Sequence, residues 1–411
     1  MEDWKEYRLG DIISIKSGFA YKGDMIGYGE NVLLGMGCVS FKERFLLSGA
    51  RAYAGDCADR YCANSGDIVL ATRQQSDNLP ILGMPAMIPD ALREKKIIIG
   101  ANLYRVDNES DFSNEYIYWL LKTPLYVNHI RSCQSGTTVR MITKANIEDF
   151  RFKAPNRKER DKIVSILKSL DDKIEVNRKI NENLEQQAQA LFKSWFVDFE
   201  PFKNGEFVES ELGMIPKGWR VGTLSEIANY INGLAMQKFR PNDGEIGLPV
   251  LKIKELGQGI CDGNSELCSP SLIGDKYIIN DGDIIFSWSG TLMVKVWCGG
   301  KCGLNQHLFV VIPNKYPKWF VYQWTKNHLD NFIRIAKDKA VTMGHIKRGE
   351  LDKAKVVIPN NEQFAKMDVL MTPIFDEIIK REIESRRLAE LRDTLLPKLM
   401  SGELKVNKVE I

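Results

Sequence analysis

The sequence predicts an α+β protein with two repeated mixed α/β units, separated by an antiparallel coiled coil of two long helices and related by a pseudo-twofold axis. Three observations lead to this fold class. The 411-residue chain matches itself at a nearly constant offset, each copy ends in a long amphipathic pattern, and each copy holds short β-type runs and an aromatic-rich helical segment. The length itself indicates two or three domains.

The internal repeat is an ordered series of matched residues. Near the start of each copy the offset is about 215 residues and pairs Trp4 with Trp219, Leu9 with Leu224, Ile12 with Ile227 and Gly18 with Gly233. It is about 216 residues between 66–69 and 282–285, which both begin Gly-Asp-Ile. It falls to about 204 for Tyr118 with Tyr322, Ile142 with Ile346, Ile147 with Leu351 and Pro155 with Pro359. The second copy is therefore shorter after its Gly-Asp-Ile turn.

Within each copy, alternating and apolar runs predict strands at 66–71, 97–106, 282–287 and 306–312. Helical spacing predicts helices at 114–131 and 318–335. Their aromatic stripes are more typical of core packing than of a platform for stacking bases, and they comprise Tyr116, Trp119, Leu120, Tyr126, Trp319, Tyr322 and Trp324.

The first copy ends in a helix predicted from about Arg157 to about Phe196. Asn156 followed by Glu159 has the spacing of an N-terminal cap, and Pro155 ends the preceding strand. Apolar residues then recur in alternating steps of four and three, which is a coiled-coil pattern. The seam comprises Ile163, Leu167, Leu170, Ile174, Leu184, Leu191 and the two polar members Asn177 and Asn181. These asparagines weaken the seam and are candidates for fixing its register.

The second copy ends in a matching helix, predicted from about Asn361 to about Leu396, with Asn360 and Gln363 as its cap. Pro373 predicts a kink or short break near Thr372, and Pro397 with Ser401 and Gly402 predicts the end. The apolar seam comprises Met371, Ile374, Ile378, Leu388 and Leu395, interrupted by Arg381 and Ser385. Two such helices can be each other's partners, or each can pack on its own unit. Their length favours pairing.

Composition excludes several classes of protein. The net charge is only +3, so any basic surface must be a local patch. Eight cysteines without a CxxC pair indicate reduced thiols in a cytoplasmic protein, with a zinc site as the less favoured alternative. The acidic N-terminus is unlike a signal peptide, and no apolar run has the length of a membrane-spanning helix.

The sequence offers no support for catalysis. The glycine pair at 35–37 lacks the third glycine of a dinucleotide loop, and there is no phosphate-binding P-loop. There is also no Asn-Pro-Pro-aromatic tetrapeptide of the kind found in amino-methyltransferases. Pro89, Asp90, Glu94 and Lys96 are too close together for a PD…ExK nuclease site. We expect no catalytic residue and no bound metal.

Three segments carry a resemblance to a known family. Residues 191–199 are LFKSWFVDF, residues 211–219 are ELGMIPKGW, and residues 391–399 are LRDTLLPKL. In this order they resemble the conserved segments of the specificity subunit of type I restriction–modification systems, and the resemblance covers the whole chain. It implies target-recognition domains at 1–155 and 201–359, a central conserved helix at 156–200, and a distal conserved helix at 360–411.

The resemblance also implies a function. Such a subunit is non-catalytic and reads a bipartite double-stranded DNA site, one half-site for each recognition domain. Its paired helices set the length of the unread gap. It binds two modification subunits, which methylate adenine N6 with S-adenosylmethionine, and restriction subunits join with ATP and Mg²⁺. None of these cofactors is expected on this chain. Because the two copies differ in sequence, two spaced readers predict an asymmetric target.

The residues that touch DNA are predicted from loop composition alone. Arg pairs with guanine, and Gln or Asn with adenine, while small, hydroxyl and basic residues suit phosphate. In the first copy the candidates are Arg73, Gln74, Gln75 and Asn78 in one loop, and Thr137, Thr138, Arg140 and Lys144 in another. In the second copy they are Ser287, Trp288 and Thr291, and Thr342, His345, Lys347 and Arg348. An ordinary solvated loop is the alternative at each, and Trp288 favours a supporting role.

Two other functions stay open. A self-contained methyltransferase or nuclease would need the motifs that are missing. The other is a coiled-coil scaffold whose globular units bind protein and not DNA.

Overall fold

The structure is a computed structural model, and it describes residues 4–74, 81–136, 139–338 and 346–408. The chain forms two compact units. Unit 1 comprises residues 1–171 and 390–411, and unit 2 comprises residues 172–389. Each unit therefore contains a part of both long helices, a division that differs from the domain boundaries expected from the resemblance.

Unit 1 is built on an antiparallel sheet of four strands in the order β2-β10-β6-β8. Alternate residues of β6 face two different cores, because side chains alternate across a strand. Ile68 and Leu70 pack with the helices, whereas Val69 and Ala71 pack towards a second sheet. The strands are β2 (Ile13–Ser17), β10 (Leu103–Asn108), β6 (Ile68–Ala71) and β8 (Pro85–Met87).

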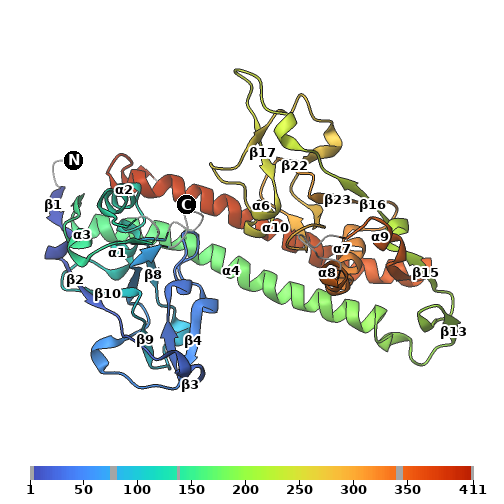
Figure 1. Cartoon of the computed structure of the whole chain (residues 1–411), viewed down its shortest axis with the longest axis horizontal. Helices are drawn as coiled ribbons and strands as arrows, with labels where there is room; N and C mark the ends of the chain where they lie inside the picture. Colours follow the sequence, from blue (N-terminus) through green and yellow to red (C-terminus); the bar gives the residue numbers. More distant parts are fainter. Residues whose placement is uncertain (1–3, 75–80, 137–138, 339–345, 409–411) are drawn as a thin grey trace. The chain divides into compact units, whose positions relative to one another are not determined.

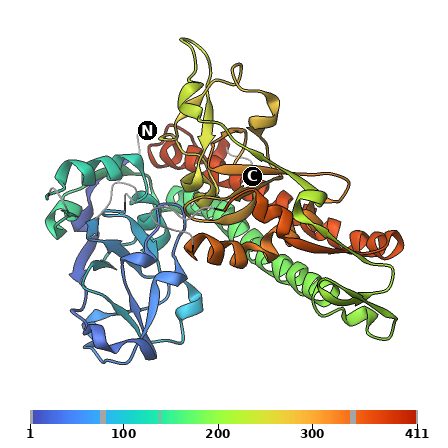
Figure 2. The same cartoon turned by 45° about the vertical axis from the view of Figure 1, so that its right-hand side comes forward.

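The second sheet of unit 1 has the order β4-β3-β9-β5, with β3 parallel to β9. It lies at the opposite end of the unit from the short helices (Figures 1 and 2). A separate pair, β1 and β12, joins the two ends of the unit's sequence. These elements are β4 (Ala50–Tyr53), β3 (Ile26–Leu34), β9 (Ile97–Ile99), β5 (Cys62–Ala63), β1 (Lys5–Arg8), β12 (Arg151–Ala154), α1 (Asn114–Leu120), α2 (Pro124–Cys133) and α3 (Lys144–Glu148).

Unit 2 repeats this topology. Its sheets have the orders β16-β23-β20-β21 and β18-β17-β22-β19, with β17 parallel to β22, and β15 pairs with β24. The strands are β16 (Ala228–Asn232), β23 (Leu308–Pro313), β20 (Asp283–Ser287), β21 (Met293–Trp297), β18 (Leu267–Cys268), β17 (Leu248–Leu251), β22 (Cys302–Leu304), β19 (Ile278–Ile279), β15 (Arg220–Thr223) and β24 (Lys355–Ile358). The helices are α5 (Leu224–Ile227), α6 (Ile253–Gln258), α7 (Lys318–Asn327), α8 (Leu329–Asp338) and α9 (Gly349–Lys353). A hairpin of β13 (Phe207–Ser210) and β14 (Gly213–Pro216) precedes them.

Strand register is also repeated. Tyr104 lies opposite Ser17 in unit 1, and Phe309 lies opposite Asn232 in unit 2. A steric constraint explains why glycine occurs at both of the matched positions, Gly18 and Gly233. A Cβ on Gly18 would lie 2.1 Å from the carbonyl oxygen of Gly100, and one on Gly233 would lie 2.3 Å from that of Asn305. At both positions, two backbone segments of the chain approach too closely to leave room for a side chain.

Three expected elements are each divided in the structure. The single strand expected at 97–106 is two strands, β9 and β10, which belong to different sheets. The helix expected at 114–131 is α1 and α2, because Pro124 begins a new helix and the Thr123 hydroxyl accepts from Tyr126 N at its start. The helix expected at 318–335 likewise divides at His328. The aromatic stripes are core, with Tyr116, Trp119 and Trp319 buried.

The long helices are α4 (Arg157–Phe196) and α10 (Asn361–Met400). Asn156 Oδ1 accepts from Glu159 N at 3.1 Å, and Asn360 Oδ1 accepts from Gln363 N at 2.9 Å. Both predicted caps are therefore confirmed. The predicted break near Thr372 is wrong, because α10 continues through Pro373 and also through Pro397, and it ends before Ser401 and Gly402.

Within unit 1, the first turns of α4 pack on the last turns of α10 (Figure 1). Ile163 and Leu167 share a core with Leu396 and Leu399. At the end of this part a buried ion pair joins Asp171 Oδ1 to Arg392 NH1 at 2.6 Å. Since early residues of α4 meet late residues of α10, the two helices are antiparallel here.

Within unit 2, the remaining parts of the helices meet in the same antiparallel sense. Asn177 Nδ2 donates to Glu384 Oε2 at 2.8 Å, and Arg381 NH1 donates to Asn177 Oδ1 at 3.0 Å. Asn181 Nδ2 donates to the Ile378 carbonyl at 3.1 Å. The polar residues that interrupt the two predicted seams therefore bind each other, which fixes the register of this part.

The predicted apolar seam lies inside the helix pair. Ile163, Leu167, Leu170 and Met371 are buried, and half-buried positions are Ile174, Leu184, Leu191, Ile374, Ile378, Leu388 and Leu395.

Candidate nucleic-acid interface

One end of the main sheet in unit 1 gathers both predicted loops. Strand β7 (Arg73–Gln74) follows β6, and it pairs with β11 (Arg140–Met141) in an antiparallel ribbon. Ile142 N also donates to the Thr72 carbonyl at 3.2 Å. Loops that are about 70 residues apart in sequence are thus held side by side by backbone hydrogen bonds.

Basic side chains meet a tyrosine at this ribbon. Lys144 Nζ lies 5.9 Å from the centre of the Tyr104 ring, and the Tyr104 hydroxyl donates to the Ile142 carbonyl at 3.4 Å. Burial raises the pKa of Tyr104, and the charge of Arg73 opposes that rise. Arg73 is exposed, while Arg140 and Lys144 are half-buried. We call Arg73, Arg140 and Lys144 the basic ribbon, a local cationic patch of the kind that suits phosphate oxygens.

Gln74 has a structural position. Its side chain is 7% exposed, and its Oε1 accepts from Leu82 N at 3.3 Å. A base contact by Gln74 would require this bond to open. Gly136 directly precedes the predicted residues of the second loop. Its φ is +91°, and a Cβ there would lie 2.2 Å from the Val139 carbonyl oxygen, so this position requires glycine.

The equivalent end of unit 2 is anchored by an aromatic ring. Trp288 Nε1 donates to Asn232 Oδ1 at 2.9 Å, and its ring lies 5.7 Å from that of Phe309. Ile346 N donates to the Trp288 carbonyl at 3.2 Å, which repeats the bond from Ile142 to Thr72 in unit 1. Trp288 is thus tied to the ends of β16 and β23 and to the segment before α9. Ser287 is fully buried and bonds the Ser289 carbonyl.

The remaining predicted residues of unit 2 lie around this anchor. Thr291 follows Gly290, whose φ is +65°, and it is exposed. Lys347 is exposed, and Arg348 NH2 donates to the Tyr230 carbonyl at 3.0 Å, which brings the segment beside β16. The predicted residues Gln75, Asn78, Thr137, Thr138, Thr342 and His345 lie outside the described residues.

Sequence reasoning missed a polar turn at this end of unit 2. Gln306 and His307 stand just before β23, and their side-chain nitrogens Nε2 are 3.3 Å apart. Their positions were assigned to the strand expected at 306–312. The signal that separates them from the strand is the pattern itself, because two polar residues precede the apolar run that begins at Leu308.

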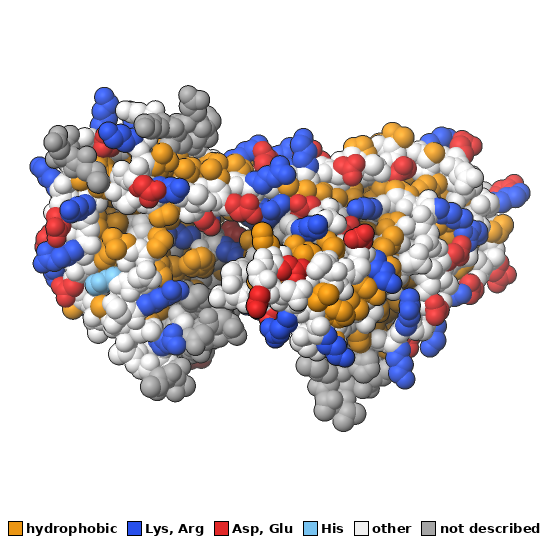
Figure 3. All heavy atoms as spheres, turned by 90° about the horizontal axis from the view of Figure 1, so that it is seen from above, with side chains coloured by type: hydrophobic (Ala, Val, Ile, Leu, Met, Phe, Trp, Pro, Cys, Tyr) orange, Lys and Arg blue, Asp and Glu red, His pale blue; other side chains and the backbone are white. Residues whose placement is uncertain are grey.

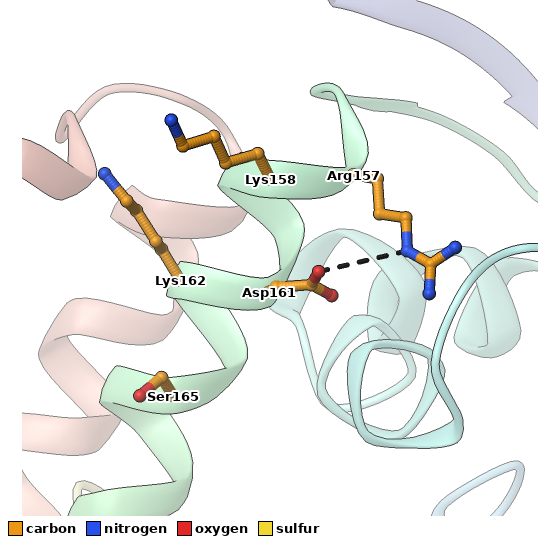
Figure 4. A pocket seen from close by; sticks show the side chains of 5 residues that line it. All are labelled: Arg157, Lys158, Asp161, Lys162 and Ser165. Atoms are coloured by element: carbon orange, nitrogen blue, oxygen red, sulfur yellow. Dashed lines mark ion pairs between the residues drawn. The ribbon is translucent and has the colours of Figure 1, made fainter.

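Other charged surfaces have simpler explanations. In the face drawn in Figure 3, Lys and Arg side chains are interspersed with Asp and Glu. On α4, Lys173 pairs with Glu384 at 3.7 Å and Arg178 with Glu175 at 2.7 Å. A pocket on the first turns of α4 is lined by Arg157, Lys158, Asp161, Lys162 and Ser165 (Figure 4). Its Arg157 pairs with Asp161 at 3.9 Å, and Lys162 donates to Asn407 Oδ1 at 3.0 Å.

Metal-ligand groupings and membrane-spanning helices are both absent from the described residues. Among them, no three His, Cys, Asp or Glu side chains are grouped to hold a metal ion. Asp90 and Lys96, from the weak nuclease-like pattern, bond Ser65 and Asp56 respectively and do not approach a shared site. None of the described helices has the length and apolarity to cross a membrane.

Fold and site together define a class of protein: an internally duplicated binding protein with two unlike loop surfaces on equivalent sheet ends and paired long helices. The family model described as "Type I restriction modification DNA specificity domain" matches residues 1–186 and 216–393, and the chain belongs to this family.

Relatives agree with this assignment. The chain is 30% identical to the type I restriction enzyme MjaIX specificity subunit of Methanocaldococcus jannaschii, over 72% of this chain and 70% of the relative. It is 24% identical to the HindI specificity subunit of Haemophilus influenzae, over 98% and 100% of the two chains. The crystal structure of the S subunit of a type I system from M. genitalium has the same fold, with a TM-score of 0.53 at 15% identity, covering 97% and 96% of the chains.

Proposed function

We propose that this chain is the DNA-reading subunit of a type I restriction–modification complex, and that it recognises an asymmetric bipartite site. One observation carries the proposal. The main sheets of the two units are equivalent. At the same end of each sheet, unit 1 has the basic ribbon and unit 2 has a polar loop anchored by Trp288. Equivalent scaffolds with unlike side chains are what two different half-sites require.

We further propose that partner subunits supply the chemistry. Modification subunits would carry S-adenosylmethionine and methylate adenine N6, and restriction subunits would use ATP and Mg²⁺. The chain itself would bind none of these cofactors and would have no turnover of its own. A methyltransferase acting on a base must take it out of the stack, and no residue described here is assigned that task.

The first experiment compares the chain alone with its complex. Purified alone, the chain is expected to show no S-adenosylmethionine turnover. Purified with a modification subunit, it is expected to confer adenine methylation at one bipartite sequence, detected by methylome sequencing. Methylation without sequence preference would contradict the proposal. Binding to a protein partner without any DNA selectivity would favour the alternative scaffold function.

The second experiment tests the helices as a spacer. Inserting a few residues near Lys173 is expected to lengthen the unread gap while both half-sites keep their sequence. A matching insertion in α10 opposite this point preserves the seam, because Lys173 pairs with Glu384. A changed half-site with an unchanged gap would refute the spacer role.

A further inference from the structure

We infer that Gln306 reads an adenine in the half-site of unit 2, and that His307 is the positioning residue that orients its amide. This inference rests on the proposed DNA-reading function and gives it a residue and a base. It begins from a turn that the two units share but fill differently.

The turn is fixed by its backbone. Leu308 N donates to the Asn305 carbonyl at 3.0 Å, and the buried Asn305 side chain accepts from His307 N at 3.2 Å. Asn305 N in turn donates to the Leu251 carbonyl at 3.1 Å. Gln306 and His307 therefore project from a rigid support, which lowers the entropy lost on binding.

The orientation of the Gln306 amide follows from its hydrogen bond. An amide nitrogen donates, so this contact is a hydrogen bond from Gln306 Nε2 to His307 Nε2 in the tautomer that carries the ring proton on Nδ1. This leaves the Gln306 Oε1 and the second hydrogen of its Nε2 for a ligand. Adenine presents the complementary pair in the major groove, with N6–H₂ as donor and N7 as acceptor.

The surroundings hold His307 in place. Its ring centre is 6.1 Å from that of Trp288, which is itself bonded to Asn232. Arg348 lies beside the same strand through its bond to Tyr230. The same strand, β16, thus holds the residue that anchors Trp288 and the carbonyl that accepts from Arg348.

Unit 1 fills the equivalent turn with a different pair of residues. Phe19 bridges Gly100 as Leu234 bridges Asn305, so Ala101 and Asn102 occupy the places of Gln306 and His307. The Asn102 carbonyl is occupied by Thr72, through both its N–H and its hydroxyl. The turn therefore differs between the units at the position where different half-sites would need a difference.

The test is a selection from randomised DNA duplexes by the full chain with its modification subunit. Gln306→Ala is expected to lose about tenfold to a hundredfold of the preference for one A·T pair in one half-site, with the other half-site unchanged. Gln306→Glu is expected to select cytosine at that position, because a carboxylate accepts from its N4 amine. His307→Ala is expected to weaken the same preference without replacing it.

Asn229→Ala is the matched control, because Asn229 is an exposed amide on the same strand as Asn232 but at the opposite end of the sheet. It is expected to leave the selected sequence intact. Thermal unfolding checks that each variant folds, and Gln306→Met replaces any that does not, since it keeps the length and removes the amide.

Different outcomes would overturn the inference about Gln306 and the proposed DNA-reading function. An unchanged motif in folded Gln306→Ala or Gln306→Met overturns the inference while the proposed function stands. A wild-type complex that selects no sequence overturns the proposed function. A motif that changes in both half-sites overturns the inference too, since one turn of unit 2 would then not be a local reader.

Discussion

Unit 1 and unit 2 share their sheets, strand register and crossing points, but they differ where the main sheet ends. Unit 1 closes that end with the basic ribbon, and unit 2 closes it with Trp288 and a polar turn. The comparison shows that the sheet topology and register are the same in both units, while the side chains at the end of the main sheet differ. Substitutions in one unit can therefore be compared with the other unit or with a neutral position in the same unit.

The largest loss of stability is expected where glycine allows two backbone segments to approach each other closely. Gly18→Ala should destabilise unit 1, and Gly233→Ala should destabilise unit 2, each by roughly 4 kcal/mol or more, because the new Cβ meets backbone and not a movable side chain. Hydrogen exchange of peptides from each unit would show which one opens. Gly23→Ala and Gly274→Ala are the controls, since nothing lies within 4 Å of a Cβ at either. Equal effects of test and control variants would refute the explanation.

The next effect concerns how each unit holds α10. Arg392 of unit 1 is 7% exposed and pairs with the similarly buried Asp171. Arg392→Met leaves this buried carboxylate with Arg44 NH1 at 3.7 Å as its remaining cation, and should cost about 3–5 kcal/mol. Arg386 of unit 2 bonds Asp281 at 2.8 Å and the Cys298 carbonyl but is more exposed. Arg386→Met should cost roughly 1.5–3 kcal/mol. Urea unfolding of both variants measures the ranking, and a reversed order would contradict it.

A third prediction separates phosphate contact from base readout in the basic ribbon. Arg140→Ala and Lys144→Ala should each weaken binding to all sequences and lower the salt slope by about 1. Titrations at several salt concentrations provide the measurement. Arg93→Ala is the control, because Arg93 is an exposed arginine of unit 1 paired with Asp90. A changed base preference with an unchanged slope would instead mean that these side chains read bases.

The smallest effect is a pH dependence confined to unit 2. Burial lowers the pKa of His328, whose Nε2 donates to the Lys355 carbonyl at 2.8 Å. The unfolded chain therefore binds a proton more readily than the folded one, and stability should fall as the pH drops through the ordinary value of about 6.5. The free energy of unfolding of His328→Gln, measured between about pH 8 and about pH 5, should depend less on pH than that of the wild type. Identical profiles would exclude this histidine as the cause.

Much of this fold could be predicted from sequence because its signals are local. The start of α4 at Arg157 follows from the Asn156 cap, and the helix pairing follows from apolar spacing and length. The same local logic failed at Pro373, where the surrounding helix outweighs the lost hydrogen bond. It also merged β9 with β10, because apolar spacing does not show that two strands belong to different sheets.

The candidate site was only partly predictable. Loop composition brought out Arg73 and Arg140, which the structure places on paired strands, but it also selected Gln74 and Ser287, whose side chains are buried. Composition does not report burial. Gln306 and His307 directly precede an apolar strand, so the sequence pattern included them in it. The pairing of Ser287 with Leu308 brings His307 close to Trp288, with 6.1 Å between the two ring centres.

The bonds from Ile142 to Thr72 and from Ile346 to Trp288 have a consequence for how such proteins diversify. In each unit, the bond ties the residue after the β6 or β20 strand to the segment that precedes the last short helix. A one-residue insertion inside a strand would reverse the faces of the side chains that follow in that strand, whereas an insertion in the loop after β6 or β20 leaves the strands themselves unchanged. Unit 1 already has the longer connection after its β6 strand. New lengths and new chemistry can therefore accumulate in these loops without any cost to the interior.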